Sequence, residues 1–449
     1  MHRRNALRAL GLSLGAAATT PLFGFDELGR ELAQPTFGEF KPTRPVTLVT
    51  LGAGNRGNVY GDFAKAYPEQ LKVVGAAEPI DVRRARYASK HNIPGEQLFT
   101  TWEHVFERPK FADAVLISTP DDLHYGPCMA ALEAGYHVLL EKPIAPTEQE
   151  CRDILAAAER TGRIVAVCHV LRYAPYFEAL RDHVRTGKLG RLISVQHFEP
   201  IEHQHMAHSF VRGNWHNSAA TTPIILAKSC HDLDILRWII GEPCQEVSAF
   251  GDLTWFKKAN QPAGATARCL EGCTVEPTCP YSALKIYDRD GNYTYVFDLP
   301  EDPALHKQAV LDYLRTTDYG RCVYDMDNDQ CDHYVVNMRF GKEVTASFSM
   351  EAFTSYHGRR TRLMGSHGDL VGDMSQFVFT DFLTGERTEW AMSTDGHGGG
   401  DWKLVADFVR AVDAEDASLL TSTVQASVES HLMGFAAERS RKAGEVVKV

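Results

Sequence analysis

With 449 residues, the chain is long enough for two domains and a large hydrophobic core. Hydrophobic residues make up 44% of it and charged residues 23%, which is ordinary for a globular protein. The net charge of −11 and the lack of any Lys/Arg-rich run argue against nucleic acid or an anionic membrane surface as a partner.

The first thirty residues are typical of a leader rather than of a fold. Arg3 and Arg4 precede a weakly apolar, Gly/Ala-rich run from Ala9 to Ala18, which is too short to span a bilayer. This resembles a twin-arginine signal, although a frayed basic N-terminus is the alternative. We therefore expect residues 1–30 to be a signal peptide, residues 31–43 a linker, the Tat translocase a transient partner, and the mature protein periplasmic or otherwise exported.

A glycine-rich turn follows the first predicted strand. Residues 46–51 read as a buried strand, glycines follow at 52, 54 and 57, and a helix comes next. In G-x-G-x-x-G, Gly52 permits the tight turn, Gly54 lets a pyrophosphate approach the backbone, and Gly57 lets the helix pack on the strand. The free N–H groups of the helix N-terminus, near Asn55 and Arg56, favour phosphate binding. The sequence predicts a dinucleotide site here, with a plain structural turn as the alternative.

An acidic residue ends the second predicted strand. Glu78 follows the strand 72–77 and is placed to accept hydrogen bonds from ribose hydroxyls, which favours NAD over NADP. A surface carboxylate is the alternative, and Arg83 and Arg84 leave NADP open.

Further strands alternate with helices as far as residue 170. The strands are expected at 114–118, 136–140 and 164–167, and a helix is expected to follow His124. This alternation predicts an α/β domain over residues 44–170 with a doubly wound parallel sheet, whose ligand lies at the carboxyl ends of the strands. Lys142 stands at such an end, where it can hold a substrate hydroxyl beside a nicotinamide; a surface lysine is the alternative.

The remaining residues, 171–449, predict an α+β domain. Period-two alternation at 344–350 and around Phe377 and Phe379 is typical of half-buried antiparallel strands. Helices are expected at 175–186, 224–240, 401–412 and 424–442. We expect this domain to bind substrate and to form the oligomer contacts.

Three motifs occur together in order: residues 52–57, Thr119-Pro120 with His124, and Glu141-Lys142-Pro143. In this combination the chain resembles the Gfo/Idh/MocA oxidoreductase family. The resemblance implies a Rossmann domain followed by an open, mainly antiparallel sheet. It also implies bound NAD(P), sugar or cyclitol substrates and a dimer or tetramer. Lys142 corresponds to the family's substrate-positioning lysine, and Glu141 lies beside the cofactor.

The predicted helix at 224–240 departs from the family pattern. The family places an Asp and, four residues later, a His on one helix face. Here His231 matches the His, Ala227 occupies the Asp position, and Lys228 follows it. We expect His231 to be the general acid or base, with Lys228 shaping the local charge. A satisfied core histidine is the alternative.

Several polar residues outside these motifs are candidates for substrate contact. A loop rich in histidine and aromatic residues mixes apolar and hydrogen-bonding groups as sugar sites do, although a solvated loop is the alternative. His397 lies in Gly396–Asp401, which resembles the His-Gly-Gly segment of NAD-dependent α-N-acetylgalactosaminidases and implies a glycosidase that oxidises its sugar transiently. The substrate candidates are Arg172, Tyr173, His208, Arg212, Trp215 and His397.

Three of the ten cysteines concentrate at about residues 262–290, which we expect to be an insertion. Cys269, Cys273 and Cys279 leave disulfides, a structural zinc site and free thiols all open. Taken together, the sequence predicts an exported NAD-dependent oxidoreductase acting on a sugar, cyclitol or glycoside. The alternatives are a glycoside hydrolase or lyase with a transient oxidation step and a non-catalytic, cofactor-stabilised sugar-binding protein.

Overall fold

The computed structural model describes residues 40–392 and 399–449. The predicted leader and His397 lie outside these residues. None of the described helices is both long and apolar enough to cross a membrane.

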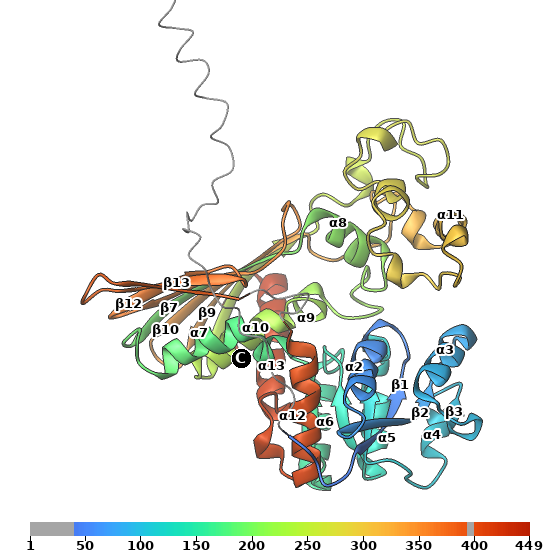
Figure 1. Cartoon of the computed structure of the whole chain (residues 1–449). Helices are drawn as coiled ribbons and strands as arrows, with labels where there is room; N and C mark the ends of the chain where they lie inside the picture. The colour runs from blue at the N-terminus through green and yellow to red at the C-terminus, as the bar shows by residue number, and fades with distance from the viewer. Residues whose placement is uncertain (1–39, 393–398) are drawn as a thin grey trace, which may run out of the picture. The chain divides into compact units, whose positions relative to one another are not determined.

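The N-terminal part is a six-stranded parallel sheet with the strand order β3-β2-β1-β4-β5-β6. This confirms the predicted doubly wound sheet (Figure 1). The strands are β1 (Val46–Leu51), β2 (Leu71–Ala77), β3 (Leu98–Phe99), β4 (Ala114–Ile117), β5 (His137–Leu140) and β6 (Val165–Val167). The helices are α2 (Asn55–Ala66), α3 (Asp81–His91), α4 (Glu103–Phe106), α5 (Tyr125–Glu133) and α6 (Glu148–Thr161).

The parallel sheet is buried on both faces, as its apolar strands require. On one face, Val46 and Leu48 of β1 pack with Phe63 of α2 and with Phe408 of α12 (Gly400–Ala414). The other face belongs to a separate cluster that includes Val49. The helix α12 therefore covers the first sheet although it lies in the segment 171–449 that the sequence assigns to the second domain, because its apolar stripe completes the core of the Rossmann domain.

The C-terminal part is built on a nine-stranded sheet with the order β14-β13-β12-β11-β7-β10-β9-β8-β15. Its strands are β7 (Leu192–Pro200), β8 (Cys244–Asp252), β9 (His333–Phe340), β10 (Val344–Glu351), β11 (Arg360–Gly365), β12 (Gly368–Gly372), β13 (Gln376–Asp381), β14 (Arg387–Ala391) and β15 (Val447–Lys448). Neighbouring strands are antiparallel except β7 and β10, which are parallel. This confirms the predicted open, mainly antiparallel sheet.

Helices cover one face of this second sheet (Figure 1). They are α7 (Pro175–Arg185), α10 (Cys230–Ile240) and α13 (Val424–Ala443), and α13 also contacts α6 of the first domain. The single helix predicted at 224–240 is instead α9 (Ile224–Ala227) and α10, interrupted at Lys228 and Ser229. This interruption leaves the carbonyl of Ala227 at the end of a helix, where it can accept a side-chain hydrogen bond.

A long segment joins β8 to β9, and residues 253–332 are called the insertion below. Within it lie α11 (His306–Thr316) and several short turns, and its described residues form no strand of either sheet. Together with α8 (His203–His205), these loops stand beyond one end of the second sheet (Figure 1).

Candidate active site

The glycine turn between β1 and α2 has the shape of a pyrophosphate site. Gly52 has a φ of +88°, and a Cβ built on it would lie 2.6 Å from the carbonyl oxygen of Ser118. A Cβ on Gly57 would lie 2.2 Å from the carbonyl oxygen of Gly52, whereas a Cβ on Gly54 would meet no described heavy atom within 4 Å. Two glycines are thus needed for packing and the middle one faces open space. No side chain caps α2, so its first N–H groups remain available to a phosphate.

Glu78 is fixed beside this turn. It is buried, and its carboxylate accepts hydrogen bonds from the backbone N–H of Ala53 at 2.8 Å and of Ile80 at 3.0 Å. Each carboxylate oxygen keeps a further lone pair. The turn and this carboxylate together fit the pyrophosphate and the adenosine ribose of NAD.

Glu141 lies at the carboxyl end of β5 and is held by neighbouring groups. Its Oε1 accepts from Arg56 Nε at 2.6 Å and from the Tyr60 hydroxyl at 2.7 Å. Burial raises the pKa of Glu141, but Arg56, Lys142 and Tyr60 outweigh burial and leave that pKa below its usual value. Arg56 also pairs with Asp401 of α12 at 2.5 Å. Its guanidinium thus joins α2, β5 and α12.

The Lys142 and His124 motifs meet in space. The ring of His124 forms hydrogen bonds to the carbonyl oxygens of Pro143 at 2.7 Å and of Thr119 at 3.0 Å. Lys142, which precedes a cis proline, donates from Nζ to the carbonyl oxygen of Ala227 at 2.8 Å. The lysine ammonium therefore bridges the nucleotide-binding domain and the helix pair that carries His231.

Asp121 is a site residue that the sequence reasoning missed. It is buried and accepts a hydrogen bond from Trp215 Nε1 at 2.9 Å. Burial raises the pKa of Asp121, opposed by the nearby charges of His124 and Lys142. The sequence feature that points to Asp121 is its position within the Thr119-Pro120…His124 motif.

His231 and Lys228 lie on the substrate-domain side. The ring of His231 meets His169 edge-on, with ring centroids 5.8 Å apart. Lys228 Nζ pairs with Glu199 at 3.2 Å, and Glu199 also contacts Arg359 at 2.9 Å. The charge of Lys228 is therefore balanced by a buried carboxylate, and its catalytic role stays a prediction.

A second histidine, His205, lies in the short helix α8. His205 packs among Tyr293, His357 and Phe210, with ring centroids 5.8 to 6.0 Å away. Burial lowers the pKa of His205 well below its usual value, and the nearby charges of Lys228 and Lys142 lower it further. This lowered pKa favours the neutral imidazole at His205. The sequence pattern indicated His208, and not His205, as a substrate candidate. The direction of each side chain in this loop depends on the tertiary fold, so the sequence alone could not distinguish the two histidines.

Four predicted substrate residues are engaged elsewhere. Arg172 forms a buried, two-bond ion pair with Asp234, and the Tyr173 hydroxyl donates to Asp407 at 2.9 Å. His208 bonds to the Tyr287 hydroxyl at 2.8 Å and stacks on Tyr293. Arg212 donates to the carbonyl oxygens of Arg321 and Tyr281. These contacts give each of the four side chains a partner within the protein, and their role in substrate binding stays a prediction. Trp215 meets the cofactor-side loop through Asp121.

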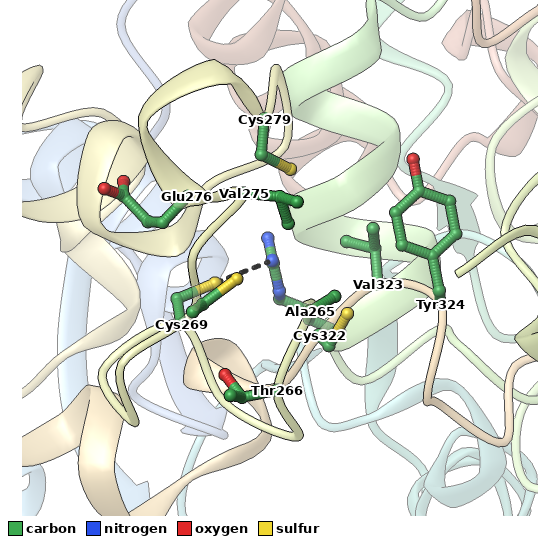
Figure 2. Close-up of a pocket in the computed structure, with 11 residues that line it drawn as sticks. Ala265, Thr266, Cys269, Val275, Glu276, Cys279, Cys322, Val323 and Tyr324 are labelled. Carbon is green, nitrogen blue, oxygen red and sulfur yellow. Dashed lines mark hydrogen bonds between the residues drawn. The ribbon is translucent and has the colours of Figure 1, made fainter. Parts of the chain in front are cut away.

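Of the three alternatives left open at Cys269, Cys273 and Cys279, neither the zinc site nor the disulfides are supported. These thiols and Cys322 line a cavity of about 20 Å³, which has room for one water molecule (Figure 2). The described residues nonetheless hold no group of three His, Cys, Asp or Glu side chains arranged for a metal ion, and all ten cysteines are free thiols. Arg212 lines the same cavity and donates to Cys269 Sγ at 3.9 Å. The positive charge of Arg212 would repel a metal cation placed among the thiols.

Comparison with known proteins assigns both halves of the chain. Residues 46–169 match a model described as "Oxidoreductase family, NAD-binding Rossmann fold", and residues 181–449 match "Oxidoreductase family, C-terminal alpha/beta domain". The putative oxidoreductase YteT of Bacillus subtilis is 25% identical over 67% of this chain and 73% of its own. The 1,5-anhydro-D-fructose reductase of Ensifer adhaerens is 32% identical over 40% of this chain and 52% of its own.

Solved structures share the fold. The inositol dehydrogenase homolog of Azotobacter vinelandii, in complex with NADH and myo-inositol, superposes with a TM-score of 0.64 at 17% identity. That match covers 91% of this chain and 98% of the other.

Proposed function

Because the chain belongs to the Gfo/Idh/MocA oxidoreductase family and is an NAD-dependent oxidoreductase, we propose that it oxidises a ring hydroxyl of a sugar or cyclitol. Two of the similar proteins named above support this, one by its name as a 1,5-anhydro-D-fructose reductase and one by its complex with myo-inositol. The observation that carries the proposal is the position of Lys142. Its ammonium stands at the carboxyl end of β5, where a parallel sheet binds its ligand, and it reaches the domain that carries His231.

The chemistry divides between the cofactor and the side chains. NAD, when bound, supplies the hydride acceptor. Lys142 donates a hydrogen bond to the substrate hydroxyl oxygen and so orients the carbon that is oxidised. Since Ala227 stands where the family has an Asp, the hydroxyl proton passes to His231. Glu141 remains ionised against Arg56 and keeps the strand end rigid.

Lys142→Met tests this role against a panel of sugars, cyclitols and glycosides. Loss of the group that orients the reacting carbon should lower kcat by about 10²-fold. NADH absorbance reports turnover, mass spectrometry reports bound NAD, and Lys72→Met, which removes an exposed lysine of β2, is the matched control. Turnover by Lys142→Met within threefold of the parent would exclude the proposed role. Release of free sugar from a glycoside without NADH accumulation would select transient oxidation instead.

Export is a separate proposal that rests on Arg3 and Arg4. A twin-arginine signal would carry the folded chain with its NAD bound, so that the cofactor would be regenerated within each cycle. Cell fractionation of the full chain and of the double variant Arg3→Lys, Arg4→Lys tests it. Equal partition of both proteins to the cytoplasm would refute export.

Self-association is the third proposal. Phe250 of β8 and Val335 of β9 are paired across strands and are 62% and 45% exposed. Apolar side chains on an uncovered sheet face favour contact with a second copy. Light scattering should give a dimer or tetramer, and Phe250→Glu should shift it toward the monomer.

A further inference from the structure

An ion pair ties the insertion to the nucleotide-binding domain. Arg83 of α3 contacts Asp298 of the insertion, with Nε 2.8 Å from Oδ1. The next residue, Leu299, accepts a hydrogen bond from Arg86 through its carbonyl oxygen at 2.8 Å. The insertion thus docks on α3 at two successive residues.

Asp298 is held in place from within the insertion. Its backbone N–H donates to the Tyr313 hydroxyl at 3.1 Å, and the ring of the preceding Phe297 stacks on Tyr313 with centroids 4.7 Å apart. The carboxylate is therefore presented to Arg83 by a packed aromatic pair and not by a free loop.

Arg83 lies in the first turn of α3, five residues after Glu78, whose carboxylate fits the adenosine ribose. The hydrogen bond to Asp298 and, more weakly, the charge of Glu78 raise the pKa of Arg83. A cation at this position is the group that accommodates the 2′-phosphate in NADP-binding proteins. The neighbouring Arg84 is also occupied, because it donates to the Glu78 carbonyl oxygen at 2.6 Å and pairs with Asp81.

We propose that Asp298 is a cofactor-specificity residue that withholds Arg83 from the 2′-phosphate of NADP. The proposal rests on the NAD-dependent activity and deepens it. With Asp298 in place, a 2′-phosphate would face two carboxylates, those of Glu78 and Asp298, and a guanidinium whose charge is already balanced. With Asp298 neutralised, Arg83 is free to make a charge-assisted hydrogen bond to the phosphate. A residue 215 positions away from Arg83 in the chain thus sets the preference for NAD together with Glu78.

The test measures which dinucleotide the protein retains. Purified full-length protein is incubated with equal concentrations of NAD and NADP, freed of unbound nucleotide and analysed by mass spectrometry. We expect Asp298→Asn to raise the ratio of bound NADP to NAD at least tenfold. Thermal denaturation with each nucleotide gives a second readout and reports whether each variant is folded.

Two further variants isolate the cause. The double variant Arg83→Gln, Asp298→Asn should lose the gain, because the freed guanidinium is its source. Glu276→Gln breaks an ion pair to Arg289 inside the insertion, 2.6 Å long, and should leave the ratio unchanged. An unchanged ratio in folded Asp298→Asn, or a gain that persists in the double variant, would overturn the proposal while leaving the NAD-dependent function intact. A parent protein that neither retains nor is thermally stabilised by either nucleotide would overturn both.

Discussion

Replacing Arg172 by Met separates a structural role from substrate contact. In the structure, Arg172 Nε and Nη2 donate to the two oxygens of Asp234 at 2.7 and 2.6 Å. The two side chains are only 3% and 1% exposed, and a further bond joins Arg172 to the Thr421 carbonyl oxygen. The pair links the turn that follows β6 to α10, the helix of His231.

The magnitude follows from burial. Removing one partner of a buried ion pair leaves an uncompensated charge, which costs about 3 to 5 kcal/mol. Ser430 Oγ still donates to Asp234 at 3.1 Å in Arg172→Met, so we expect the lower end, about 3 kcal/mol. The double variant Arg172→Met, Asp234→Leu should recover most of the loss, because apolar replacement of both partners removes the stranded charge.

Urea unfolding followed by circular dichroism measures these changes, and initial rates give KM. Arg160→Met is the matched control, because its pair with Glu133 is exposed and should leave the unfolding midpoint unchanged. The reasoning fails if Arg172→Met unfolds like Arg160→Met while KM rises, since that outcome would return Arg172 to the substrate site.

The remaining predictions concern the nucleotide turn and acid stability. Gly54→Ala should weaken NAD binding at least tenfold in calorimetry without changing stability. Gly57→Ala should lower both NAD affinity and stability, because its Cβ would overlap a backbone oxygen. Gly95→Ala is the control, and normal NAD affinity in Gly54→Ala would contradict a pyrophosphate at this turn. Burial lowers the pKa of His169 to about 3. Between pH 6.5 and pH 3, His169 therefore binds a proton in the unfolded chain but not in the native protein. The free energy of unfolding should therefore decrease as the pH is lowered through this window. His169 contributes about 1.4 kcal/mol per pH unit to this decrease. His169→Asn should reduce the pH dependence of the urea unfolding midpoint. An unchanged pH dependence would refute the role given to His169.

Local patterns predicted the elements and the nucleotide motif well. The strand, the three glycines and the following helix depend on neighbouring residues, and so does the period-two strand β10. The break between α9 and α10 was not predicted, because the apolar pattern continues through it. The place of α12 was not predicted either, since it depends on which sheet its apolar stripe meets.

Side-chain roles divided along the same line. For Glu78 and Lys142, the sequence by itself determined the position at the end of a parallel strand, because strand ends and turns are local features. Only the tertiary structure decided that Arg172 pairs with Asp234, that Asp121 meets Trp215, and that Asp298 holds Arg83. Each of these contacts joins residues more than sixty positions apart. A buried charged or polar group must pair with a group that lies near it in the folded protein, and the local spacing of residues in the sequence does not determine which group that is.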